Sequence, residues 1–173
     1  MSTTGSSTNN FNGITPVVVP ATNSNNGRNE IEKRYPTTQA QLEVWLASHQ
    51  STASNCAYNE ISSLFFEGQL DADNLRKAID QVVERHASLR STFSDDGSEV
   101  LVHKSLPYDF QSLDFTSKAD KEIQEAIVSV VQNESRTPFD LVKGPLLRVV
   151  LQKTGPQSHK LTVSAHHLSL IHI

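Results

Sequence analysis

Residues 146–167 read LLRVVLQKTGPQSHKLTVSAHH, and they decide the fold. Two runs rich in Val and Leu flank a polar segment that contains Gly155 and Pro156. This pattern predicts two antiparallel strands joined by a turn. The second predicted strand ends on His166 and His167, so two adjacent histidines lie at the end of a strand.

The histidine pair admits more than one interpretation from spacing alone. Successive side chains of a strand point to opposite faces, so His166 and His167 are not expected to bind one metal ion together. His159 and His172 are too loosely placed to complete a ligand set, and we expect no metal site. Either the pair consists of two polar residues at a strand end, or one histidine faces a cleft while the other makes structural hydrogen bonds. Histidine suits a catalytic role because its unperturbed pKa of about 6.5 lies near neutrality.

Three upstream segments carry helical patterns. Asp71 is the expected N-cap of a helix whose apolar face runs from Leu75 to His86 at 3,4 spacing. Thr38, followed three residues later by Gln41, predicts a capping box at the start of another helix. The expected helices lie within 35–50, 71–90 and 120–134.

Two further segments are predicted to be extended. Residues 56–68 combine β-branched and aromatic residues up to Gly68, which predicts a strand. Residues 91–104 predict a hairpin with Asp96 and Gly97 at its turn. The order helix, strand, helix, hairpin, helix, hairpin predicts an α/β fold of two layers, a mixed sheet with helices packed on it.

Composition limits the function. Residues 1–33 are mostly Ser, Thr, Asn and Gly, and we expect a disordered polar arm or linker there, not a signal peptide. The net charge of −4 and pI of about 5.9 argue against a nucleic-acid groove. No window is apolar enough to span a bilayer, and the single cysteine, Cys56, excludes an intrachain disulfide framework. We expect a cytoplasmic protein without nucleic-acid or membrane partners.

Four stretches resemble the condensation domains of nonribosomal peptide synthetases. TQAQLEVW (38–45) resembles their motif SxAQxRLW, RHASLRSTF (85–93) resembles RHExLRTxF, and AHH (165–167) resembles the start of MHHxxxDG. PFDLVKGPLLRVVL (138–151) is also typical of this family, and the four follow in the family's order. Glu43, Ala87 and Ser91 depart from the motifs, and the Asp-Gly expected after His167 is missing.

The resemblance implies a chloramphenicol-acetyltransferase-like fold, of which residues 34–167 form the N-terminal half. It implies amide formation between an upstream carrier-bound acyl or peptidyl thioester and the amine of a downstream carrier-bound aminoacyl thioester. His167 is then the catalytic residue, and His166, Arg85 and Arg90 support it. The implied partners are carrier domains with phosphopantetheine arms, next to adenylation or polyketide synthase modules. The resemblance implies no metal and no directly bound cofactor.

Three alternatives stay open. They are a related CoA- or carrier-dependent acyltransferase, an epimerisation domain, and a non-catalytic half-domain that docks carriers. The tail LSLIHI (168–173) is similar to an in-frame translation of a transposon end used as a sequencing adapter, and we expect it to be foreign to the protein. The alternative is a genuine strand, because apolar and polar residues alternate in it.

Overall fold

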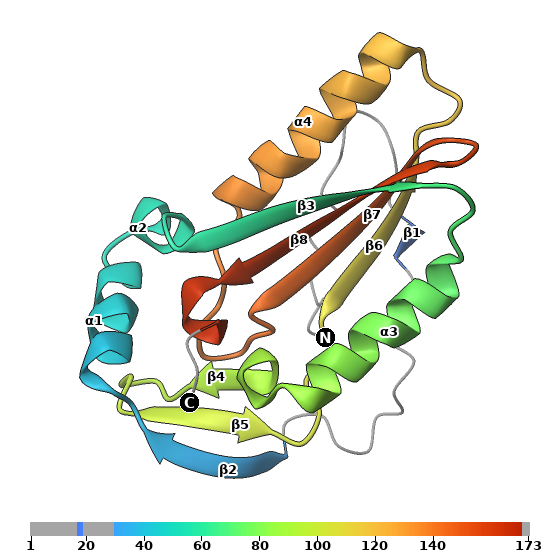
Figure 1. The fold of residues 1–173 in the computed structure, drawn as a ribbon. Helices are drawn as coiled ribbons and strands as arrows, with labels where there is room; N and C mark the ends of the chain where they lie inside the picture. Colours follow the sequence, from blue (N-terminus) through green and yellow to red (C-terminus); the bar gives the residue numbers. More distant parts are fainter. Residues whose placement is uncertain (1–16, 19–29, 171–173) are drawn as a thin grey trace, which may run out of the picture.

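The computed structural model describes residues 17–18 and 30–170 (Figure 1). Its main sheet has the strand order β1-β6-β7-β8-β3, and a smaller sheet has the order β2-β5-β4. Strands β6 and β7 are parallel and the other neighbours in the main sheet are antiparallel, so the predicted mixed sheet is confirmed. The elements are β1 (Val17–Val18), β2 (Ile31–Pro36), α1 (Gln39–Ser48), α2 (Thr52–Cys56), β3 (Asn59–Glu67), α3 (Ala72–Arg85), η1 (Ala87–Arg90), β4 (Ser91–Phe93), β5 (Glu99–His103), β6 (Asp109–Asp114), α4 (Asp120–Arg136), β7 (Leu147–Gly155), β8 (Ser158–His166) and η2 (His167–Ser169).

The predicted hairpin forms the centre of the main sheet as β7 and β8, paired from Leu147 with Ala165 to Gly155 with Ser158. The helices α3 and α4 cover its two faces (Figure 1). Leu151 packs in the cluster on the α3 side, whereas its neighbour Val150 packs against α4. Both faces of β7 are therefore buried, which explains its nearly continuous apolar run.

All three predicted helices are present. The side chain of Asp71 accepts a hydrogen bond from the backbone N–H of Asn74 and caps α3, and the Thr38–Gln41 capping box begins α1. Ile123, Ala126 and Val130 lie on the face of α4 that packs on the sheet. The expectation that His86 lies on the apolar face of α3 is wrong. The helix ends at Arg85, and His86 is its exposed C-cap.

Several elements were not anticipated from the sequence. Among them are the short helix α2, the strands β1, β2 and β6, and the short helix η2. Strand β2 begins at Ile31, so the expected boundary of the polar arm at residue 33 falls inside a strand that pairs with β5. Val17–Val18, also within the expected arm, pair with β6. The rest of the arm lies outside the described residues.

A second core joins the smaller sheet to α1 and to the 138–146 segment. Trp45, Phe93, Phe139 and Leu168 belong to this cluster. The predicted turn at Gly97 is confirmed, with a φ of +71°. A Cβ on Gly97 would lie 2.6 Å from the indole ring of Trp45, so the turn needs glycine both for its backbone and for its close approach. Leu168 is buried here, and the origin of residues 168–173 stays a prediction.

Candidate active site

The two histidines occupy different environments at the end of β8. His166 is the last residue of the strand and is fully buried, whereas His167 begins η2 with a side chain that is 44% exposed. The backbone N–H of His167 donates to Tyr58 O at 2.8 Å and so extends the pairing of β8 with β3 by one residue. The two rings have different hydrogen-bond partners, although the Tyr58 ring lies near both, with its centroid 5.9 Å from that of His166 and 6.5 Å from that of His167.

The ring of His166 is committed to structural hydrogen bonds. The Leu168 N–H donates to its Nδ1 at 3.3 Å, so this nitrogen is the acceptor. The Ser48 hydroxyl donates to Val44 O, which leaves its oxygen to accept the Nε2–H of His166 at 3.3 Å. Both ring nitrogens are satisfied in the neutral imidazole.

The surroundings of His166 also oppose its protonation. Burial, helped by the nearby rings of His167 and His49, lowers the pKa of His166 to about 4. The Phe139 ring meets His166 edge-on and adds an apolar wall, with the two ring centroids 6.1 Å apart. His166 thus stays neutral near pH 7, and its place in the fold is that of a strand-end anchor.

His167 has the opposite character. Its Nδ1 lies 3.2 Å from Glu60 Oε1, and its ring centroid is 6.5 Å from that of Tyr58. Among the described residues its Nε2 has no hydrogen-bond partner. A half-exposed imidazole with one engaged and one available nitrogen can accept a proton or hydrogen bond from a bound molecule.

Arg85 and Arg90, the two predicted supporting arginines, differ in burial and in hydrogen bonding. Arg90 donates to Val83 O and, through Nη1, to the backbone oxygens of His103 and Lys104, and it pairs with Glu32 at 3.3 Å. It therefore ties the end of α3 to β5 and β2. Arg85 is exposed in the last turn of α3, and no carboxylate of the described residues forms an ion pair with it. Neither arginine forms a hydrogen bond or ion pair with the histidine pair in the part of the chain that the structure describes.

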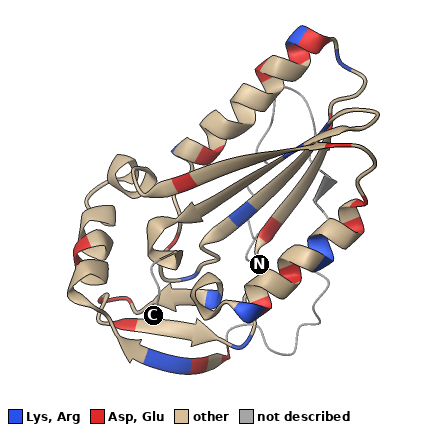
Figure 2. Cartoon of the chain, viewed as in Figure 1, with Lys and Arg blue, Asp and Glu red and all other residues tan. Residues whose placement is uncertain are grey.

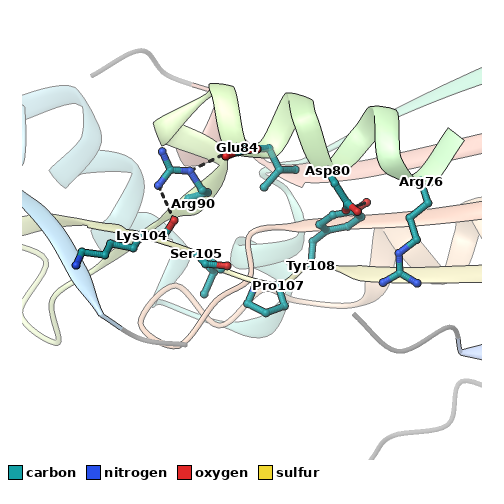
Figure 3. Close-up of a pocket in the computed structure, with 10 residues that line it drawn as sticks. Arg76, Asp80, Glu84, Arg90, Lys104, Ser105, Pro107 and Tyr108 are labelled. Carbon is teal, nitrogen blue, oxygen red and sulfur yellow. Dashed lines mark hydrogen bonds between the residues drawn. The ribbon is translucent and has the colours of Figure 1, made fainter. Parts of the chain in front are cut away.

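Arg90 instead lines a cavity of about 290 Å³ between α3 and the 104–108 segment (Figure 3). Tyr108 donates to Asp80 Oδ1 at 2.9 Å across one end of it, and burial together with this carboxylate raises the pKa of Tyr108. The cavity is lined by cationic and anionic side chains, among them Arg76 and Glu84. Neither histidine of the pair lines it.

A buried ion pair supports the strand end from the α4 side. Glu134 Oε2 accepts from Arg148 Nε at 2.7 Å and from the hydroxyl of Ser164, two residues before His166. The Arg148 guanidinium lies 3.7 Å from the Phe139 ring centroid, and Phe139 borders His166. Arg148 lies in the 138–151 segment that is typical of the resembled family, but its partner Glu134 could not be predicted because it lies on a different element.

The rest of the described structure offers neither a surface of one charge nor a cluster of metal ligands. The helices α3 and α4 each carry both basic and acidic side chains (Figure 2). Within residues 17–18 and 30–170, no three His, Cys, Asp or Glu side chains gather as metal ligands. In the same residues, none of the helices has the length and apolar character required to cross a bilayer.

Comparison with known proteins points to one family. The condensation domain family matches residues 31–170. The chain is 33% identical over 136 residues to tyrocidine synthase 3 of Brevibacillus parabrevis, and 35% identical over 140 residues to chondramide synthase cmdD of Chondromyces crocatus. These matches cover 78% and 77% of this chain but only 2% and 3% of those relatives.

Solved structures agree. The starter condensation domain of the rhizomide synthetase superimposes with a TM-score of 0.71 at 28% identity, over 79% of this chain and 33% of that one. The expected chloramphenicol-acetyltransferase-like α/β fold is confirmed, and the chain matches part of the complete domain. Since the family match includes the histidine pair and nearly all described elements, this chain belongs to the condensation domain family.

Proposed function

We propose that this chain is part of a domain that forms amide bonds between two carrier-bound substrates, with His167 as its catalytic residue. The observation that carries the proposal is the contrast between the two rings. His166 is buried and has both nitrogens engaged, whereas the Nε2 of the half-exposed His167 has no partner among the described residues. One histidine anchors the strand, and the other is left to meet a substrate.

The chemistry makes one histidine sufficient. The donor is a thioester, which is already activated, and the nucleophile is an α-amine with a pKa of about 7.7–8.0. At pH 7 roughly a tenth of the amine is neutral, so deprotonation costs only about 1.4 kcal/mol. Orientation of two reactants can contribute about 7–11 kcal/mol. His167 Nε2 then accepts a hydrogen bond from the attacking amine, whether it takes the proton or only holds the nitrogen in place.

The proposed substrates are an upstream acyl or peptidyl thioester and a downstream aminoacyl thioester, both on phosphopantetheine arms of carrier domains. We propose adenylation or polyketide synthase modules as neighbours and the cytoplasm as location. One similar structure, a double mutant of the rhizomide starter condensation domain at 27% identity, is in complex with C8-CoA and Leu-SNAC. That complex supports an acyl donor and an aminoacyl acceptor for this site.

The exposed edge of the main sheet supports a larger parent domain. Strand β3 has no neighbour on its outer side among the described residues, and Leu64 and Phe65 on it are 55% and 73% exposed. Long strand edges with exposed apolar side chains are normally covered by further chain. We propose that a second half of the domain completes the site, and that the 173-residue chain alone forms no amide product.

The first test is to sequence the source DNA across codon 167 with a primer that anneals well downstream. We expect three codons followed by Asp-Gly, and a larger open frame. The complete domain, supplied with both loaded carriers, should form amide product by mass spectrometry. H167A should lower its rate by about 10²–10⁴-fold. H86Q is the matched control, because His86 is exposed at the end of α3.

Three outcomes would overturn the proposal. One is amide formation by H167A at the rate of the unaltered domain. Another is a product with alcohol acceptors and none with amines, which would establish an ester-forming acyltransferase. Binding of carriers without any acyl transfer by the complete domain would favour a docking module.

A further inference from the structure

We infer that Glu60 is a positioning residue for His167, and that its carboxylate fixes the imidazole as the Nδ1–H tautomer. The effect on catalysis rests on the proposed function, whereas the contact between Glu60 and His167 follows from the pairing of β3 and β8 alone. Glu60 lies 107 residues before His167 in the chain.

The register of the two strands sets this contact. Strands β3 and β8 pair without interruption from Asn59 with His166 to Glu67 with Ser158. The bond from His167 N to Tyr58 O extends the same ladder. Tyr58 and Glu60 are two residues apart, so their side chains lie on one face of the sheet. Glu60 is the diagonal neighbour of His167 on that face, and its Oε1 lies 3.2 Å from Nδ1.

The chemistry of the pair decides the tautomer. An ionised carboxylate can only accept hydrogen bonds, so the Nδ1 beside it must carry the hydrogen. In the neutral ring the lone pair is then on Nε2, the nitrogen without a partner among the described residues. An imidazole without such an acceptor prefers the opposite form, with hydrogen on Nε2. Glu60 therefore reverses the ring's own preference and turns the acceptor nitrogen outward.

The orientation has a direct consequence for amide formation. The amine lone pair attacks the thioester carbonyl carbon, and the C–S bond breaks with departure of the thiolate. The proton released from the amine nitrogen passes to His167 Nε2 and then to the thiolate sulfur. A carboxylate at Nδ1 steadies the imidazolium in between, as a buried acid does for other catalytic histidines. Because the side chains of Glu60 and His167 are 56% and 44% exposed, orientation is the larger part of the effect.

The experiment reads the tautomer directly. The 15N-labelled 173-residue chain is studied by long-range 1H–15N correlation of its histidine rings at a mildly alkaline pH, with the His167 signals assigned by H167Q. We expect an Nδ1–H pattern for His167 in the unaltered chain and a shift toward Nε2–H in E60A. E67A is the matched control, since Glu67 is exposed on the same strand at its far end. It should leave the His167 pattern unchanged.

An Nε2–H pattern in the unaltered chain would overturn the inference, and this result does not depend on whether E60A folds. An unchanged pattern in folded E60A would also overturn it. Because the tautomer is measured without substrate, an Nδ1–H pattern in a domain that forms no amide would refute the proposed function and leave the pair intact. In an active complete domain, E60A should lower kcat about tenfold with KM unchanged, less than the loss of His167 itself.

Discussion

Replacing Arg148 by Met removes one half of the buried ion pair between β7 and α4. Glu134 is fully buried, and its Oε2 accepts from Arg148 Nε at 2.7 Å and from the Ser164 hydroxyl. The variant leaves this carboxylate buried with only the hydroxyl beside it. Removal of one partner from a buried pair costs about 3–5 kcal/mol, because an uncompensated charge stays in the interior. We expect R148M to lose that much free energy of unfolding, and E134M a similar amount.

The double variant E134M/R148M gives the sharper result. It leaves no buried charge, and the backbone oxygens of residues 134 and 137 keep a donor in the Asn59 side chain. The Ser164 hydroxyl then loses its acceptor and the Pro138 backbone oxygen loses its 3.5 Å contact with Arg148, which together cost about 1–3 kcal/mol. The double variant should therefore be more stable than either single one, a strong departure from additivity.

Urea unfolding followed by the fluorescence of Trp45, the single tryptophan, measures these differences. The matched control is R34M, because Arg34 and Glu99 also lie 2.7 Å apart but are 54% and 41% exposed. That variant should lose less than about 1 kcal/mol. The reasoning would be refuted if the free energy of unfolding of R148M lay within about 1 kcal/mol of that of the unaltered chain. A double variant that loses the sum of the two single losses would refute it as well.

Three further predictions concern packing and protonation. G97A should lose about 2–4 kcal/mol of free energy of unfolding, because the new Cβ would clash with Trp45 and alanine disfavours the left-handed backbone at this position. A urea midpoint equal to that of the unaltered chain would contradict this. V130A should lose about 2 kcal/mol from the core, whereas V128A, at a 52% exposed position of the same helix, should stay within about 0.5 kcal/mol; equal losses would show that α4 is packed differently. His166 should titrate near a pH of about 4 by NMR. Because its folded pKa is below its unfolded value of 6.5, its contribution to stability is complete above pH 6.5 and is lost as the pH falls toward about 4, and a titration near 6.5 would disprove the burial argument.

Much of the fold was predictable because its signals are local. The apolar spacing of α3 and α4, the Thr38–Gln41 capping box and the turn at Gly97 each depend on residues within one or two turns of chain. The hairpin β7–β8 was predictable for the same reason, since its two strands follow each other. The fold class could be inferred from these elements in order.

The strands that escaped prediction lack such signals. Strand β6 reads DFQSLD, with a buried Gln111 near its centre, and it pairs in parallel with β7, from which the whole of α4 separates it in the chain. Its partners rather than its own composition make it a strand. Strand β2 likewise forms by pairing with β5, which follows only after α1, β3 and α3.

The candidate site also combines features that local sequence determines with contacts that depend on the whole fold. The sequence by itself determined the histidine pair, its place at a strand end and the expectation that its two side chains point to opposite faces. Only the tertiary structure decided that His166 meets Ser48 while His167 meets Glu60, over separations of 118 and 107 residues. The physical reason is that the period of a strand orients side chains within a few residues. The register between distant strands, which decides the partners, is selected by the packing of the whole sheet.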